Sequence, residues 1–457
     1  MFIELHMIQS FGPSNLNRDD TGSPKDCEFG GVRRARISSQ CLKFSIRKSP
    51  AFQASTGVEE SVRTRYLTRA LSEGLAAAGK PEAEVKRVAQ AIAAGYTSKK
   101  NEMDKDDPER TKIAVYLSRN DIEWIKSELS ARWDDLVSCL DLESAEGKGK
   151  KGKSGASSSA VQALVKDMIR RTAKRAGAPD IAMFGRMLAD YPDTNVDAAC
   201  QVAHAISTHR VTMEMDFFSA VDHLQRKEET GAAMMGFTSF DSACFYRYAR
   251  IDWDQLLTNL SEERDLAKRT VEGFLRAATE AVPSGKQTNF AANNPPSFLF
   301  AVARRDGMGW SLANAFERPV RVHREGGLVA PSVQALDSYW GRLCALYGTD
   351  PLICTAVLAL DSDLPLVYLK DAQCRSLGEW VKAITDALPA AKGGHERTLV
   401  ATGGADAVLG SSEPLSRAGY WPGALQERGD RPLLRCTGTI PGVPHRRPGR
   451  VAPGRPR

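Results

Sequence analysis

The stretch FGGVRRARISSQCLKFSIRK, residues 29–48, carries six cationic side chains and no carboxylate. Its two glycines, Gly30 and Gly31, let the backbone turn or approach a ligand closely. Residues 32–37 alternate in the manner of a short strand, which would place Arg34 and Arg36 on one face. The first half of the stretch therefore predicts a glycine turn that leads into a basic strand.

The second half predicts a helix that runs to about residue 48. Ser38 or Ser39 is a suitable N-cap, because a serine hydroxyl accepts a hydrogen bond from a free N–H group of the first turn. Gln40, Lys43 and Arg47 are three and four residues apart, so they form one polar stripe on such a helix.

Leu42 and Ile46 would face the interior of the protein and hold this helix in place. The helix N-terminus and the cationic side chains would then share one surface, and both attract phosphate. We interpret this surface as an anion site and expect the anion to be RNA. A solvated charged face beside a helix cap is the alternative, and the glycines, the double serine and the missing acids argue against it.

The basic stretch and several later segments resemble the CasC family, which forms the backbone of the type I-E CRISPR Cascade complex. Near the N-terminus the resemblance lies in residues 16–20 (LNRDD), 25–26 (KD) and 29–43 (FGGVRRARISSQCLK). It continues in order through residues 203–209 (AHAISTH), 245–249 (FYRYA), 285–287 (GKQ), 313–317 (ANAFE) and 331–335 (PSVQA). The resemblance thus covers nearly all of the chain up to about residue 390.

The resemblance implies an α+β fold with a modified RNA-recognition-motif (ferredoxin-like) palm, a helical fingers insertion and a hairpin thumb. Residues 1–55 would form the first part of the palm with the basic RNA-binding loop. Residues 56–180 would form the mainly helical insertion, with a flexible loop at 144–159 that is rich in Gly, Lys and Ser. Residues 181–390 would complete the palm and include the thumb at about 210–245.

Hydrophobic periodicity also indicates a mixed architecture, without internal repeats. An alternating segment at residues 2–9 predicts the first strand, and residues 245–251 and 297–303 predict two more. Helical spacing predicts helices within residues 58–94, 120–140, 260–281 and 333–347.

By resemblance, the protein is a non-enzymatic subunit that binds guide RNA (crRNA). Several copies would line up along one crRNA, grip its backbone and present it for pairing with target DNA. The implied partners are crRNA, the target DNA strand, other copies of the chain and other Cascade subunits, including CasD. The resemblance implies no cofactor, no metal ion and no catalytic residue.

The resemblance assigns RNA contacts to polar and cationic residues of the matched motifs. These residues are Arg18, Lys25, Ser38, Gln40, Lys43, Arg47, Lys286, Arg318 and Arg321, and the basic stretch read by itself adds Arg33, Arg34 and Arg36. The family also displaces bases at regular intervals, and here Met187 and Phe218 are the candidates for that wedge. New apolar contact offsets the lost stacking, which is worth roughly 1–3 kcal/mol per base. Without the family context, both residues would be expected in the core.

Three features depart from the family pattern. Val32 and Phe44 occupy positions where relatives are expected to carry cations. The segment at residues 225–240 also differs in composition, so the geometry of the thumb tip is not predicted.

A metal-dependent endoribonuclease that cuts a bound target RNA is the alternative function. Some relatives that assemble on guide RNA cut with an aspartate, and Asp19 and Asp20 follow Arg18 in this chain. The seven histidines show no metal-ligand spacing, and His204 and His209, five apart on a segment expected to be helical, would not share a face. We expect Asp19 and Asp20 to cap their loop or to pair with Arg18.

Composition indicates a chain that can bury a substantial core, with 457 residues of which 42% are hydrophobic. No apolar run approaches the roughly 20 residues that span a bilayer, and the N-terminus lacks the features of a signal peptide. Nine scattered cysteines without a C-x-x-C pair argue for reduced thiols. We therefore expect a cytoplasmic protein that does not bind membranes.

The net charge of +6 is concentrated near the C-terminal end. Residues 395–457 hold ten arginines, no lysine and five acids, so the other 394 residues carry a net charge of only +1. The tail at 391–457 has the composition of a disordered basic arm. We prefer the hypothesis that it is out-of-frame sequence, because a shifted frame beneath residues 404–410 and 424–432 permits phrases like the opening of CasD. An in-frame stop codon near residue 395 in the sequenced locus would support this hypothesis, and a locus without a CasD-like frame would contradict it.

Overall fold

The computed structural model describes residues 1–97, 103–146, 157–174, 178–187, 192, 195–220, 234–322 and 326–389. All of them belong to one compact unit, Met1–Gly393. The tail expected at 391–457 and most of the loop expected at 144–159 lie outside the described residues.

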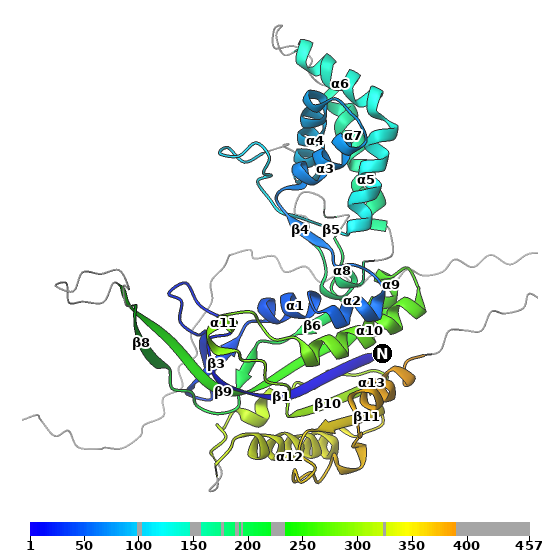
Figure 1. Cartoon of the computed structure of the whole chain (residues 1–457). Coiled ribbons are helices and arrows are strands. Elements are labelled where there is room, and N and C mark those ends of the chain that lie inside the picture. Colours follow the sequence, from blue (N-terminus) through cyan, green and yellow to red (C-terminus); the bar gives the residue numbers. More distant parts are fainter. Residues whose placement is uncertain are drawn as a thin grey trace, which may run out of the picture. The chain divides into compact units, whose positions relative to one another are not determined.

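The secondary structure of this unit mixes strands and helices along the whole chain (Figure 1). The strands are β1 (Phe2–Ser14), β2 (Asp26–Phe29), β3 (Val32–Ile37), β4 (Val62–Thr64), β5 (Val115–Leu117), β6 (Cys200–Val202), β7 (Ala205–Ser207), β8 (Glu214–Ala220), β9 (Met234–Asp252), β10 (Phe298–Arg304) and β11 (Leu352–Ala359). The helices are α1 (Ser39–Arg47), α2 (Pro50–Thr56), α3 (Leu67–Ala77), α4 (Glu82–Thr97), α5 (Arg119–Ala131), α6 (Trp133–Glu146), α7 (Ser157–Lys174), α8 (Pro179–Phe184), α9 (Trp253–Asn259), α10 (Arg264–Glu280), α11 (Gln287–Phe290), η2 (Leu312–Phe316), α12 (Val329–Tyr347), η3 (Lys370–Ala372) and α13 (Leu377–Asp386).

The main sheet is antiparallel and is built around β1 and β9. Its strand order is β11-β10-β1-β9-β7-β3-β2, and β6 and β8 also pair with β9. Phe2 at the start of β1 lies opposite Arg304 on one neighbour and opposite Asp252 on the other. The first strand of the sequence is therefore central, while the basic strand β3 lies near one edge.

Helices cover both faces of this sheet (Figure 1). Ile3 and Leu5 of β1 pack into one hydrophobic cluster with Phe274 of α10. Ile8 of the same strand belongs to a second cluster with Trp340 of α12. The odd and even positions of β1 thus serve different layers, which is the side-chain period of a strand that is buried on both faces.

The helices α3 to α7 form a hydrophobic cluster of their own. Leu71, Ile92, Leu129 and Met168 are among its buried side chains. The two-stranded sheet of β4 and β5, with Val62 opposite Leu117, contributes to the same cluster. The helices expected within residues 56–180 are therefore present.

Strands β8 and β9 form a long hairpin in the region expected to be a thumb. The pairing runs from Glu214 opposite Phe240 to Ala220 opposite Met234. Residues 221–233, which hold the expected thumb tip, lie outside the described residues.

The expected α+β class is confirmed by the antiparallel sheet and its helices. Strands are found at each of the predicted positions, and β1 and β9 extend beyond them. Two predictions of helix were wrong in part. Val62 belongs to β4, because its pairing with a strand 55 residues away decides its conformation, and His204 and His209 flank the strand β7.

No helix among the described residues is long and apolar enough to cross a membrane.

Candidate nucleic-acid interface

Helix α1 follows the sequence prediction closely. Ser38 is its N-cap and accepts a hydrogen bond from the Cys41 amide at 3.3 Å. Leu42 and Ile46 are 2% and 1% exposed, so one side of the helix is anchored in the interior. The Ser39 amide donates to Nδ1 of His204 at 2.8 Å. Protein groups thus already accept hydrogen bonds from two of the first amides of α1. We therefore expect an anion to be bound by the side chains of α1 more than by its N-terminus.

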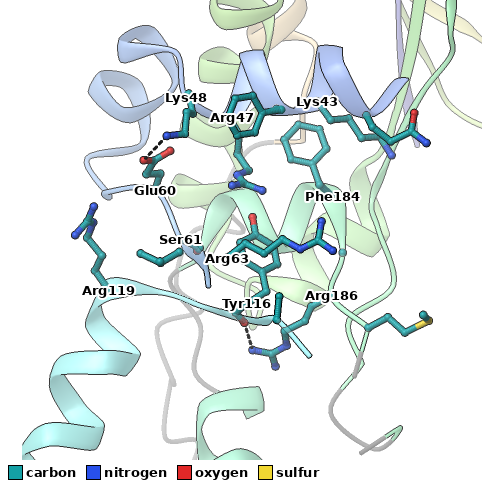
Figure 2. Close-up of a pocket in the computed structure, with 16 residues that line it drawn as sticks. Lys43, Arg47, Lys48, Glu60, Ser61, Arg63, Tyr116, Arg119, Phe184 and Arg186 are labelled. Atoms are coloured by element: carbon teal, nitrogen blue, oxygen red, sulfur yellow. Dashed lines mark hydrogen bonds and ion pairs between the residues drawn. The ribbon is translucent and has the colours of Figure 1, made fainter. Parts of the chain in front are cut away.

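A groove of about 780 Å³ runs along the exposed side of α1, and we call it the α1 groove (Figure 2). Its cationic lining residues are Lys43, Arg47, Lys48, Arg63, Arg119 and Arg186. Glu60 is the one acidic side chain among the lining residues of this part of the structure. Gln40 and Met187 line the same groove, so the predicted polar stripe and one predicted wedge residue come together.

The floor of the α1 groove is organised by a buried carboxylate. Asp180 is 1% exposed and accepts hydrogen bonds from the Ser61 amide at 2.9 Å, the Ser61 hydroxyl at 2.6 Å and the Tyr116 hydroxyl at 2.9 Å. Arg47 Nε lies 3.5 Å from Asp180 Oδ2, and the Arg47 guanidinium carbon lies 4.8 Å from the centre of the Tyr116 ring. These contacts fix Arg47, whose guanidinium extends from α1 into the groove (Figure 2).

The groove floor is also partly desolvated. Burial, and then the Asp180 charge, raise the pKa of Tyr116, so its hydroxyl stays protonated and donates to that carboxylate. Burial lowers the pKa of Arg186, which donates from Nη1 to the Tyr116 carbonyl at 3.5 Å (Figure 2). Arg186 is therefore largely a structural cation, while Arg63 and Arg119 are exposed at the rim.

Some of the rim cations have acidic partners. Lys48 Nζ lies 3.6 Å from Glu60 Oε1 (Figure 2), and Arg119 Nε lies 3.1 Å from Glu59 Oε2. Exposed pairs of this kind are worth about 1 kcal/mol or less, so a phosphate can compete for the cations. With six cationic lining residues against Glu60, Glu59 and the buried Asp180, the groove keeps a net positive charge.

A second groove of about 440 Å³, which we call the loop groove, lies between the loop at residues 16–22 and α1. Arg18, one of the predicted RNA contacts, is exposed there. Gly285 packs on this loop so closely that a Cβ atom would lie 2.3 Å from the Leu16 carbonyl oxygen. This contact places Lys286, half-buried and in the left-handed region with φ of 51°, next to the loop groove.

Asp19 and Asp20 line the loop groove, and Asp19 caps its own turn. Its Oδ1 accepts from the Thr21 amide at 2.9 Å, the Thr21 hydroxyl at 2.8 Å and the Ser23 amide at 2.9 Å. These hydrogen bonds, that of the Thr21 side chain first, lower the pKa of Asp19. The expectation that Asp19 and Asp20 cap their loop or pair with Arg18 is confirmed for Asp19, which caps the loop. Among the described residues, no group of three or more His, Cys, Asp or Glu is placed to hold a metal ion.

A third hollow of about 420 Å³ lies beside the base of the hairpin and is lined by Arg33 and Arg210. Arg33 is about half exposed and forms an ion pair with Asp26. Arg36 is half-buried and donates from Nε to the Asp26 carbonyl at 3.1 Å. Lys25 is half-buried next to them on the approach to β2.

The prediction for Arg34 needs correction, because this side chain is fully buried. Its guanidinium donates to the carbonyl oxygens of Phe29 at 3.1 Å, Ser207 at 3.0 Å, Phe316 at 2.7 Å and Glu317 at 3.2 Å. Arg34 therefore ties β3 to the segment after η2 and presents no charge to a ligand. Arg34 and Arg36 were predicted to share one face of β3, and other parts of the protein cover that face.

The same segment after η2 carries the other two predicted cations, Arg318 and Arg321, and both are exposed. Gly30 lies directly against it, since a Cβ atom on this glycine would lie 1.8 Å from the Glu317 carbonyl oxygen. The close approach predicted for the glycine pair is thus made to the protein backbone. It places Arg318 beside the turn between β2 and β3.

The two predicted wedge residues lie on the surface and outside the core. Met187, just after α8, is 81% exposed, and Phe218 on β8 is 41% exposed. The Phe218 ring covers Gly236 on the paired strand, where a Cβ atom would lie 2.5 Å from it. Phe237 on the same hairpin is 69% exposed, so the hairpin presents more apolar surface than Phe218 alone.

Sequence reasoning missed the far wall and the floor of the α1 groove. Arg63, Tyr116, Arg119 and Asp180 come from the segment 56–180, which was expected to be a mainly helical insertion, and Arg186 comes from the segment 181–390, which was expected to complete the palm. Each is an ordinary residue in its local sequence, and no spacing in that sequence marks any of them. Only the pairing of β4 with β5 and the position of α8 bring them to α1.

The chain is similar to known proteins in sequence and in structure. The model of the CT1975-like protein family matches residues 3–393. A solved chain of a "CRISPR RNA-guided surveillance complex, pre-nicking" is 29% identical with a TM-score of 0.71, over 85% of this chain and 100% of that chain. A chain of another "CRISPR RNA-guided surveillance complex" is 24% identical with a TM-score of 0.63, again over 85% and 100%, and shows a likeness of fold. No curated protein matches the sequence.

Proposed function

Because this chain belongs to the CT1975-like protein family and is similar in structure to chains of CRISPR RNA-guided surveillance complexes, we propose that it is the guide-RNA-binding backbone subunit of such a complex. The type I-E Cascade is the system that its N-terminal motifs resemble. Several copies would bind one guide RNA side by side and present it to a target DNA strand. CasD and other Cascade subunits would complete the assembly.

The α1 groove is the observation that carries this proposal. Six cationic side chains and one carboxylate line a groove of about 780 Å³. A single-stranded polyanion matches this charge, because each phosphate that meets a Lys or Arg releases counterions. The aromatic and apolar lining residues, Phe44 and Met187 among them, also suit a chain that carries unstacked bases.

The binding that we propose is directed at the RNA backbone and is therefore tolerant of sequence. Lysine and arginine contacts to phosphates position a strand without reading its bases. Lys43 and Arg47 lie one helical turn apart on the rigid helix α1, so they can hold neighbouring phosphates in a fixed register. A guide whose sequence changes while its backbone stays the same needs this kind of contact.

The hairpin of β8 and β9 supports the proposal that several copies assemble. Its described part presents exposed apolar side chains, among them Met215, Phe217 and Phe237. Apolar side chains that are exposed together on one element are typical of a binding surface. We propose that the hairpin of one copy contacts the RNA held by the next copy, with Phe218 or a neighbouring apolar residue displacing a base.

We propose a binding role without catalysis. Asp19, the aspartate considered for a nuclease, already accepts three hydrogen bonds within its own turn. The cysteines in the described part of the chain are all free thiols, which suits a protein that acts in the reducing cytoplasm.

Native mass spectrometry of the full chain with guide RNAs of two lengths tests the backbone role. The number of bound copies should rise in proportion to the length of the guide. One copy per RNA at both lengths would contradict a subunit that assembles along the strand.

A further inference from the structure

Phe44 lines both the α1 groove and the loop groove, and it is the one residue that their described linings share. On a helix with 100° per residue, Lys43 and Arg47 point to one side of Phe44, whereas Cys41 and Ser45 point to the other. The first pair lines the α1 groove and the second pair lines the loop groove. Phe44 is therefore the ridge over which a strand must pass from one groove to the other.

The exposure of this ring calls for an explanation. Phe44 is 51% exposed in the middle of a charged surface, where an aromatic ring loses the benefit of burial. The helix gives it no freedom to turn inward, because Leu42 and Ile46 already fill the buried side of α1. Lys48 Nζ lies 5.3 Å from the centre of the ring and keeps one part of it close to a cation. The remaining ring surface is open to both grooves.

We propose that Phe44 is a stacking platform for one unpaired base of the bound RNA. The proposal rests on the proposed function and adds to it a base contact in the palm, distinct from the wedge on the hairpin. The phosphate next to this base would lie in the α1 groove, near Lys43 and Arg47, and the strand would continue past Arg18 on the side of the loop groove. The ring accepts any base, because every base has a π face, and a larger purine stacks more strongly.

The charge around the ring supports a nucleotide as its occupant. Lys43, Arg47 and Lys48 flank Phe44 on the side of the α1 groove. The loop groove holds Arg18 together with the Asp19 and Asp20 carboxylates, so the attraction for a phosphate lies on the side of the α1 groove. An apolar protein segment would have to desolvate these cations without neutralising them, which is costly. A nucleotide brings a phosphate to the cations and a flat ring to the aromatic face.

The test uses the full chain and a short single-stranded RNA that accommodates one copy, with 2-aminopurine placed at each position in turn. Wild-type protein should quench the fluorescence strongly at one position. Phe44→Tyr should retain the quenching, and Phe44→Leu, which keeps apolar bulk without a π face, should lose it. Phe44→Ala should weaken binding about 5- to 150-fold, the range expected for one lost stack.

An abasic nucleotide at the quenched position gives a second, independent readout. It should weaken binding to the wild type and have little further effect on Phe44→Leu, since the two changes remove the same contact. Additive losses, or unchanged quenching in Phe44→Leu, would overturn the proposal. It is also overturned if Phe44→Leu binds the short RNA normally and impairs only the assembly of several copies, because the ring would then contact protein.

The outcome separates this inference from the proposed function. If wild-type protein binds RNA and Lys43→Ala weakens that binding while Phe44→Leu does not, only the stacking platform is wrong. If wild-type protein fails to bind single-stranded RNA at low salt, the proposed function itself fails.

Discussion

Arg47 Nε lies 3.5 Å from Asp180 Oδ2, so a cation of the α1 groove is paired with a carboxylate that is almost wholly buried. Removing a buried partner leaves an uncompensated charge, which typically costs about 3–5 kcal/mol. We expect Asp180→Ala to lower the free energy of unfolding by about that amount, measured by urea denaturation. The matched control is Asp254→Ala, whose carboxylate pairs with the N-terminal amine but is 74% exposed. A loss for Asp180→Ala as small as that of the control would contradict the role of Asp180 as an anchor.

Arg34 was assigned to RNA binding from the sequence, but its burial leads us to expect a role in stability. Its four hydrogen bonds to backbone carbonyls are buried, so Arg34→Met should lower the free energy of unfolding by about 3 kcal/mol or more. The neighbouring Arg33→Met, at an exposed ion pair, should cost less than about 1 kcal/mol. Denaturation curves of the two variants give the comparison. Equal losses would mean that Arg34 is not the tie between β3 and the segment after η2.

The salt dependence of RNA binding should also separate these two arginines. Because Arg34 presents no charge to solvent, the folded Arg34→Met protein should bind RNA with the salt slope of the wild type. A shallower slope for that variant would restore Arg34 as an RNA contact.

His6 gives a pH dependence of stability with a defined sign. Burial, and then the Arg304 charge, lower the pKa of His6 from 6.5 to about 3. Below pH 6.5, His6 is protonated in the unfolded chain but stays neutral in the folded protein. The free energy of unfolding therefore falls as the pH falls, by about 1.4 kcal/mol per pH unit. Burial raises the pKa of Asp241 to about 6, and this group acts in the opposite direction between pH 4 and 6.

The variant His6→Gln isolates the histidine contribution, because Gln can still form a hydrogen bond with the Tyr246 hydroxyl, which lies 2.9 Å from His6 Nδ1. The difference in unfolding free energy between wild type and His6→Gln should shrink as the pH falls from 7 to 5. A difference that stays constant with pH would show that His6 is not held neutral.

The nuclease alternative has a direct test. The full chain is incubated with guide RNA, complementary RNA and Mg²⁺ or Mn²⁺, and wild type is compared with Asp19→Ala. We expect both proteins to leave the RNA intact, since Asp19 Oδ1 is occupied by its turn. Metal-dependent cleavage that Asp19→Ala abolishes would replace the binding role with an enzymatic one.

Sequence reasoning was most accurate where structure is decided locally. The cap at Ser38, the end of α1 near Lys48 and the burial of Leu42 and Ile46 all depend on side chains within one short helix. Alternation also located β3, but it could not decide which of its faces is covered. Arg34 is buried by carbonyl groups of residues as far as 283 positions away, and nothing near Arg34 in the sequence indicates them.

Only part of the α1 groove was predictable from the sequence. Gln40, Lys43 and Arg47 could be assigned because helical spacing puts them on one stripe, whereas Tyr116 and Asp180 join the groove through tertiary packing alone. Phe44 was noted as a departure from the family pattern. Its position between two grooves depends on the packing of the loop at residues 16–22 beside α1, which no local pattern in the sequence indicates.

The salt dependence of RNA affinity tests the central claim most directly. For single strands, the slope of log affinity against log salt changes by about 0.7 for each phosphate contact. The account predicts that Lys43→Ala and Arg47→Ala each flatten this slope and weaken binding to unrelated RNA sequences by similar factors. Lys382→Ala, which removes an exposed charge of α13, should change neither. An unchanged slope in the α1 variants, or a loss confined to one RNA sequence, would contradict a groove that grips the backbone.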